Sequence, residues 1–220
     1  MNNKCILMMC VLLSPVIWIR QLHAASTKSA IVDSIAVHIE GVGVITRMEL
    51  VQYAALSSVI DYGYDNSIKK LKEKQFIKTY ENKLIDRLLM LKDAQLLSIK
   101  NPGQTEVNNM IQDLKSMFPG EKYYNEFLKH YAITDAGLKK YMSDELILKQ
   151  YIHDEISVLV NVNDTDIRDY YKNHITSFKG VSKEDAYKSI KQILHHKAYE
   201  KVLKSWIKTL KQHREIIILY

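Results

Sequence analysis

IVDSIAVHIEGVGVITRMEL, residues 31–50, is the stretch on which the expected fold depends. Apolar and polar residues alternate, imperfectly, from Ile31 to Glu40, and a period of two is typical of a half-buried strand. Gly41-Val42-Gly43 follows and predicts a tight turn, because glycine accepts positive φ angles. Val44-Ile45 then returns as a second strand. We therefore predict a β-hairpin here.

A hairpin strand still has backbone N–H and C=O groups that need partners. Residues 215–220, EIIILY, form the other strand-like run of the chain, at its far end. We therefore predict that the first and last thirds of the chain meet through these strands. Two arrangements are open at this point. The strands can pair within one chain, or two chains can exchange strands and form a homodimer.

The composition between these ends indicates helix. The chain has 220 residues, 47% hydrophobic and 25% charged, with only three prolines and seven glycines, too few for a turn-rich β protein. Capping boxes begin helices at Thr46 and Asn163, and Ser182 caps the last helix. The fold class is therefore predicted to be mainly α with a small β-sheet, closed by an N-terminal hairpin and a C-terminal strand.

Two of the predicted helices are unusually long. Apolar residues recur every three or four positions over residues 67–99 without a breaker, which predicts one continuous helix of about 50 Å. Asn101-Pro102-Gly103 ends it. The last helix carries a lysine face, predicted to be its solvent side, with acidic clients or phospholipid headgroups as the alternative partners of this face. These lysines are Lys191, Lys197, Lys201, Lys204, Lys208 and Lys211.

Residues 1–25 have the layout of a secretory signal peptide. Lys4 precedes an apolar run over residues 5–19, and Ala24-Ala25 supplies a small-residue end. The run, at about 15 residues, is shorter than the roughly 20 needed to span a bilayer. We predict cleavage and a periplasmic or otherwise exported location, with an uncleaved anchor near the membrane as the alternative. Because Cys5 and Cys10 both lie here, no disulfide or catalytic thiol is expected in the rest of the chain.

Three stretches carry a resemblance to a known family: VITRMEL at residues 44–50, LIDRLL at 84–89 and VNDTDIRDYY at 162–171. Their order resembles that of the SurA-like periplasmic chaperones, which include SurA, PpiD and PrsA-type foldases and are related by fold to the C-terminal chaperone part of trigger factor. The resemblance implies a single chaperone module over residues 26–220. Its core would comprise residues 26–100 and 182–220, and residues 101–181 would form a helical arm.

The chain departs from the family pattern in one respect. Most relatives carry a parvulin prolyl-isomerase domain after the helix that contains Tyr170-Tyr171, whereas residues 172–181 leave no room for one. The resemblance therefore does not imply isomerase activity. His195-His196 would point about 100° apart on a helix, poorly placed to chelate one ion. We expect no enzymatic activity, cofactor or metal.

The expected function is an exported, ATP-independent holdase that binds unfolded envelope or secreted proteins in an apolar helical cradle. Its candidate client-contacting residues share adaptable methionine or aromatic side chains; they are Met110, Met117, Phe118, Tyr123, Tyr124 and Phe127. Core packing is the alternative interpretation of this set. The alternative function is a dedicated assembly or scaffold protein for one partner in the cell envelope. Nucleic acid is not expected as a partner, because charges of both signs are interspersed along the chain.

Overall fold

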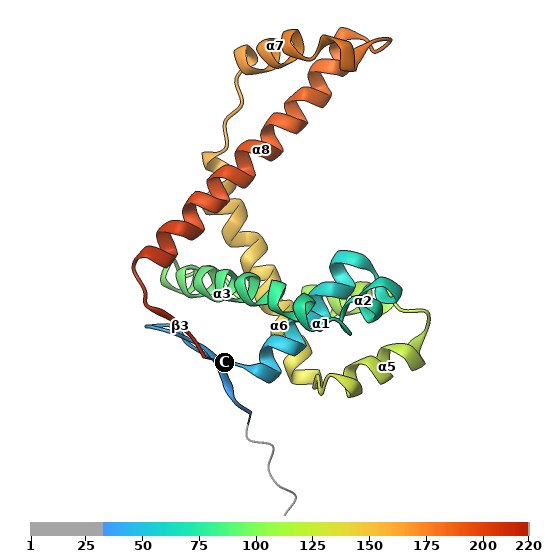
Figure 1. Ribbon diagram of the computed structural model, residues 1–220, viewed down its shortest axis with the longest axis vertical. Helices are drawn as coiled ribbons and strands as arrows, with labels where there is room; N and C mark the ends of the chain where they lie inside the picture. Colours follow the sequence, from blue (N-terminus) through green and yellow to red (C-terminus); the bar gives the residue numbers. More distant parts are fainter. Residues whose placement is uncertain (1–32, 220) are drawn as a thin grey trace, which may run out of the picture. The chain divides into compact units, whose positions relative to one another are not determined.

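The hairpin and the C-terminal strand form one antiparallel sheet in the computed structural model, which describes residues 33–219 (Figure 1). Strand β1 (Ile35–Ile39) lies between β2 (Gly43–Thr46) and β3 (Ile216–Ile218). His38 of β1 faces Val44 on one side and Ile217 on the other. The predicted meeting of the hairpin with the last strand is thus confirmed, here within one chain. The predicted signal segment, residues 1–25, lies outside the described residues.

The turn of the hairpin uses the glycines as predicted. Gly41 has φ 69° and Gly43 has φ 143°, a region that side chains with a Cβ atom rarely adopt. At the opposite edge of β1, the N–H of Glu40 donates to the carbonyl of Glu215 at 2.9 Å. These contacts satisfy backbone groups that a lone hairpin would leave to water.

Helices make up most of the described chain, which confirms the predicted fold class. The first four are α1 (Arg47–Tyr62), α2 (Tyr64–Lys70), α3 (Lys74–Leu96) and α4 (Gln104–Ser116). They are followed by α5 (Glu121–His130), α6 (Asp135–Tyr151), α7 (Asp164–Asn173) and α8 (Lys183–Gln212). Short irregular helices continue α6, as a π-helix η1 (Ile152–Ile156) and a 3₁₀ helix η2 (Ser157–Leu159), and η3 (Ile175–Phe178) precedes α8.

The predicted helix starts have the expected chemistry. The Thr46 hydroxyl accepts from the N–H of Glu49 at 3.2 Å, while the Glu49 carboxylate accepts from the N–H of Thr46 at 2.8 Å. The same reciprocal pair forms between Asn163 and Asp166. Local side-chain hydrogen bonds therefore define where these helices begin.

The prediction of one continuous helix over residues 67–99 is wrong. The helix is interrupted between Lys70 and Lys74, so α2 and α3 are separate helices. Leu71 is buried at this break, where its N–H still donates to the carbonyl of Ser67 at 2.8 Å. Burial of Leu71 in the tertiary fold therefore prevails over the local helical pattern.

The main hydrophobic core unites elements from both ends and the middle of the chain. Val37 from β1, Leu89 from α3, Leu114 from α4 and Met142 from α6 belong to one buried cluster, which Leu210 of α8 joins. Helices α4 and α5 thus contribute to the same core as the sheet and α3. This core positions the helices around which the candidate site forms.

Helix α8 packs through two different faces. Its first half buries Ala186 and Ile190, and α7, whose Ile167 is buried, packs against α8. Its last half places Trp206 and Leu210 against the main core. Ile190 and Trp206 lie about 160° apart around the helix at 3.6 residues per turn. The exposed face of α8 therefore changes sides along its length.

No helix within residues 33–219 has both the length and the apolar character needed to cross a bilayer.

Candidate functional site

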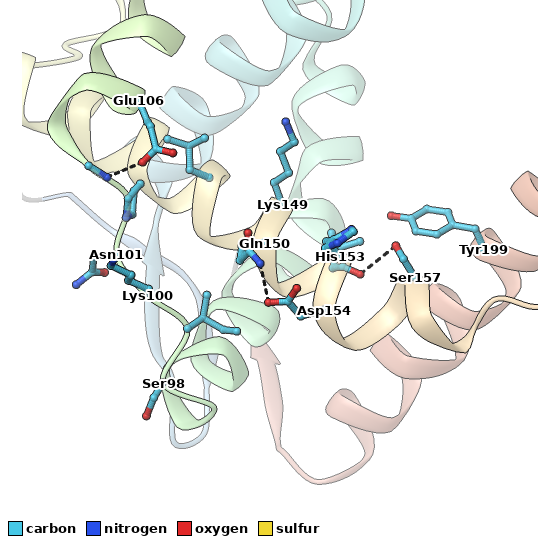
Figure 2. Close-up of a pocket in the computed structure, with 15 residues that line it drawn as sticks. Ser98, Lys100, Asn101, Glu106, Lys149, Gln150, His153, Asp154, Ser157 and Tyr199 are labelled. Carbon is cyan, nitrogen blue, oxygen red and sulfur yellow. Dashed lines mark hydrogen bonds between the residues drawn. The ribbon is translucent and has the colours of Figure 1, made fainter.

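The principal hollow of the described chain is a crevice along α8. Three cavities adjoin there, of about 1050, 470 and 520 Å³, and Tyr199 of α8 lines all three. The largest lies between the α3–α4 loop, the end of α6 with η1, and α8 (Figure 2). The second follows α8 from Lys191 to Tyr199, and the third runs between α3, α6 and Ile207. We call these three cavities together the α8 crevice.

Four polar side chains that line the largest cavity have local partners. Figure 2 shows Gln150 donating to Asp154, at 2.7 Å, and Ser157 donating to the carbonyl of Ile152, at 3.2 Å. Glu106 accepts from the N–H of Gly103 at 2.7 Å and so caps α4. These bonds hold the walls in place. They do not form a nucleophile–base pair of the kind that acyl transfer requires.

The side chains that remain available in the crevice include cations, a phenol and polar groups such as those of Asn101 and His153. Lys100, Lys149 and Lys191 line it and form no ion pair within the described residues. The Tyr199 phenol is neutral at physiological pH, as tyrosine ordinarily is, and burial raises its pKa further. The crevice thus offers hydrogen-bond donors beside apolar walls such as Ile152.

The widened end of α6 shapes one wall of this crevice. The helix changes to π geometry at Ile152 and then to 3₁₀ geometry at Ser157. Such π segments are rare and often occur at functional sites. Here the change directs the chain away from the core toward α7.

A buried tyrosine fixes α8 across the other two helices. The Tyr151 hydroxyl of α6 donates to the Asp93 carboxylate of α3 at 2.7 Å and accepts from Trp206 Nε1 of α8 at 2.5 Å. Burial raises the pKa of Tyr151, which is fully buried. An ion pair between Lys211 and Asp86 adds a second link from α8 to α3. These two links hold α8 at a fixed position beside α3 and α6, and so keep the walls of the crevice in place.

Arg87, within the LIDRLL stretch, ties α3 to α6 on the floor of the crevice. Its guanidinium lies 2.8 Å from Glu145 and 3.4 Å from Asp144, and it donates to the carbonyl of Tyr141 at 3.2 Å. It also lies 5.0 Å from the centre of the Tyr141 ring. Because the side chain of Arg87 is 7% exposed, this network supports the fold beneath the crevice.

The six residues predicted to contact clients are placed differently from one another. Phe118, Tyr124 and Phe127 are buried in the core, with the Phe118 ring 5.2 Å from Phe127 and 5.4 Å from Tyr124. Met110 is partly buried against the same core. Only Met117 and Tyr123 are exposed, at 41% and 46%. In this conformation, those two are the ones available to a partner.

Exposed apolar residues instead flank the largest cavity. Val158 is 72% exposed and Leu159 is 55% exposed, directly after the lining residue Ser157. Leu96 and Leu97, at 67% and 47%, directly precede the lining residue Ser98. We call these four residues the apolar rim. In the sequence, these residues form short apolar runs next to helix ends. The sequence did not predict a functional role for the rim or for Tyr199.

No group of three or more His, Cys, Asp or Glu side chains that could hold a metal occurs in residues 33–219. Comparison with known proteins gives no further guidance, because no family model and no curated protein matches the chain. The geometry of the crevice and its rim is therefore the basis for the functional proposal.

Proposed function

We propose that this protein is an exported, ATP-independent holdase-type chaperone, without isomerase activity, that binds unfolded envelope or secreted proteins. The observation that supports the proposal best is the α8 crevice with its apolar rim. Val158 and Leu159 expose large apolar side chains beside a cavity of about 1050 Å³. Exposed apolar surface of this kind often marks a site of interaction with another molecule.

The dimensions of the crevice suit an extended polypeptide segment. From Lys191 to Ile207, α8 extends about 24 Å at 1.5 Å per residue, which corresponds to about seven residues of extended chain. The lining combines apolar residues, such as Ile99 and Ile152, with amides such as Gln150. A mixed surface of this kind contacts both side chains and backbone, and so tolerates many client sequences.

The proposed mechanism is reversible burial. Apolar side chains of an unfolded client contact the rim, with about 25 cal/mol gained per Å² of apolar surface removed from water. While bound, they are hidden from other unfolded chains, which prevents aggregation. Release needs no ATP, because folding buries the same side chains in the client's own core.

An aggregation assay tests the proposal. A chemically unfolded client is diluted into buffer with the full-length protein, and light scattering is followed. We expect the wild-type protein to suppress scattering at stoichiometric amounts, and the double variant Val158→Asp/Leu159→Asp to suppress it markedly less. The matched control Met117→Asp/Tyr123→Asp also replaces two exposed apolar residues, but outside the rim, and should behave as the wild type.

Each other outcome has a defined meaning. Loss of suppression in the Met117→Asp/Tyr123→Asp variant alone would move the client site to α4 and α5. Absence of suppression by the wild-type protein would refute the holdase. Recovery of one stoichiometric partner from the cell envelope, in place of many weakly bound ones, would support a dedicated assembly or scaffold protein instead.

A further inference from the structure

Four lysines lie along one line on the C-terminal half of α8: Lys197, Lys201, Lys204 and Lys208. Their spacings of four, three and four residues place them on a single helix face. All four are exposed, and none forms an ion pair within the described residues. The Lys197 ammonium lies 5.3 Å from the centre of the Tyr170 ring, a contact that leaves its charge unneutralised. We call these residues the basic stripe.

Many lysines elsewhere in the described chain have acidic partners nearby. Lys139 lies 2.8 Å from Asp135, and Lys140 lies 2.7 Å from Asp144, each at the helical i, i+4 spacing. Residues 186–212, in contrast, contain Glu200 as their only acidic residue, and Glu200 lies 3.3 Å from His196. On the neighbouring helix α7, Asp169 lies 3.7 Å from Lys172 and Asp166 accepts from the N–H of Asn163. The stripe therefore presents positive charge that no ion pair within the described residues neutralises.

The stripe faces away from the crevice. Lys201 and Lys208 lie about 160–180° from Tyr199 around the helix axis, at 3.6 residues per turn. Trp206 and Leu210, on the opposite side of the helix from Lys208, pack against the core. A partner bound to the stripe would therefore leave the α8 crevice open.

The chemistry of the stripe favours a flat anionic surface. It contains no arginine, so it lacks a planar guanidinium group, which can donate two parallel hydrogen bonds to a single phosphate. The residues between its lysines on the exposed side include Ser205 and Thr209, which cannot stack on nucleic-acid bases. The aromatic ring beside the stripe, Tyr170, already stacks on His174 and contacts Lys197. Lysine ammonium groups are compact charges that are attracted to an anionic membrane surface without a fixed geometry. The predicted export segment, residues 1–25, also brings the chain to a membrane.

We propose that the basic stripe docks the protein on the surface of a bilayer rich in anionic phospholipids, with the α8 crevice facing away from it. Each lysine near such a surface contributes roughly a fivefold increase in affinity. The attraction falls with salt, because the Debye length shortens from about 10 Å at 0.1 M to about 3 Å at 1 M. This docking does not depend on the holdase activity.

Co-sedimentation with vesicles tests the docking. The full-length protein is mixed with phosphatidylcholine vesicles containing 30% phosphatidylglycerol, or with pure phosphatidylcholine vesicles, at low and high salt. The variant with Lys197, Lys201, Lys204 and Lys208 all changed to Gln is compared with a control in which Lys122, Lys129, Lys139 and Lys172 are changed to Gln. Both variants lose the same charge from exposed sites, so net charge alone cannot distinguish them. Pure phosphatidylcholine gives the binding contributed by the apolar residues 5–19.

We expect the wild-type protein and the control to prefer the anionic vesicles, and the stripe variant to lose that preference by roughly several hundredfold, the product of four fivefold contributions. High salt should remove the preference of the wild-type protein as well. Equal preference in the stripe variant and the control would overturn the proposal. Binding of the wild-type protein to duplex DNA or polyglutamate, but not to anionic vesicles, would overturn it in favour of another polyanion. Aggregation suppression measured without vesicles reports the holdase separately.

Discussion

Single polar side chains link the three helices that border the crevice, and Tyr151 is the clearest example. Its hydroxyl bridges Asp93 of α3 and Trp206 of α8. Removing one member of a buried hydrogen-bonded set leaves its partners unsatisfied, which costs more than the net value of the bond. The Tyr151 hydroxyl therefore supports the packing of α8 on the core, alongside the apolar contacts of Leu210 and the Lys211–Asp86 ion pair.

Tyr151→Phe is expected to lower the free energy of unfolding by about 1–3 kcal/mol, because Trp206 Nε1 and the Asp93 carboxylate each lose a buried partner. Urea denaturation followed by circular dichroism measures the change. Tyr123→Phe, at a tyrosine that is 46% exposed, is the matched control and should change stability by less than about 0.5 kcal/mol. Equal effects in the two variants would contradict the bridging role.

Arg87→Ala is expected to cost about 3–5 kcal/mol, because it leaves Glu145 and Asp144 without their buried cation. The control is Lys139→Ala, which breaks an exposed ion pair with Asp135 and should cost less than about 1 kcal/mol. Urea denaturation at neutral pH measures the change in the free energy of unfolding for both variants. A loss below about 1 kcal/mol at Arg87 would show that the network is hydrated and contributes little.

Tyr53 provides a pH-dependent prediction. Burial raises the pKa of its phenol from 10.0 to about 12. Between those two values the unfolded chain has lost this proton and the folded chain keeps it, so the contribution of Tyr53 is complete below pH 10 and declines as the pH rises toward 12. The free energy of unfolding of the wild-type protein should therefore fall more steeply from pH 9 to 11 than that of Tyr53→Phe. Parallel pH profiles would show that Tyr53 titrates normally.

At the scale of the element, β3 decides how the chain is closed. It lies at the edge of the sheet, and His38 faces Ile217 across the β1–β3 pair. The Cβ atoms of directly opposed residues in an antiparallel pair lie about 4.5–5.5 Å apart. That distance permits a disulfide after a small adjustment.

The double variant His38→Cys/Ile217→Cys, with Cys5 and Cys10 changed to Ser, should form a disulfide within one chain on mild oxidation. Non-reducing electrophoresis would then show a monomer of altered mobility, and thiol titration would show that no free cysteine remains. A control pair that is not opposed in the sheet, His38→Cys/Ser205→Cys, with Ser205 on α8, should stay reduced. A disulfide-linked dimer as the main product would show that β3 is exchanged between two chains, as in the homodimer considered from the sequence.

Local chemistry allowed several elements to be predicted. Thr46, Asn163 and Ser182 begin helices as expected, because each is the N-cap and its side chain accepts from a backbone N–H within the next turn. The break after α2 was not predicted, because neither glycine nor proline marks it. Burial of Leu71 there depends on core residues that are distant in the sequence.

At the scale of the whole molecule, α8 separates two proposed activities on opposite faces. The crevice face, centred on Tyr199, is proposed to hold clients, and the face with Lys201 and Lys204 is proposed to meet the bilayer. The separation follows from the change of buried face between Ile190 and Trp206. A membrane-docked chaperone of this kind would receive clients without releasing the lipid surface.

The candidate site could be predicted from the sequence only in part. The composition of Phe118, Tyr124 and Phe127 indicated adaptable apolar contacts, but the same residues satisfy a core equally well. Burial distinguishes the two, and burial depends on which helices pack together. The apolar rim at Val158 and Leu159 was visible only as an apolar connector, because its exposure depends on the end of α6.

The sequence by itself determined the hairpin of β1 and β2, its closure by the last strand and most helix starts. The hairpin and the helix starts depend on periodicity, glycine turns and hydrogen bonds within one turn of chain, all of which neighbouring residues set. The closure could be predicted because an unpaired strand needs a partner and the chain has one other strand-like run. Only the tertiary structure decided where α3 begins, which aromatic residues are buried and where the crevice lies. The crevice depends on Asp93, Tyr151 and Trp206 meeting from three helices, and no local pattern encodes a contact between residues so far apart in the chain.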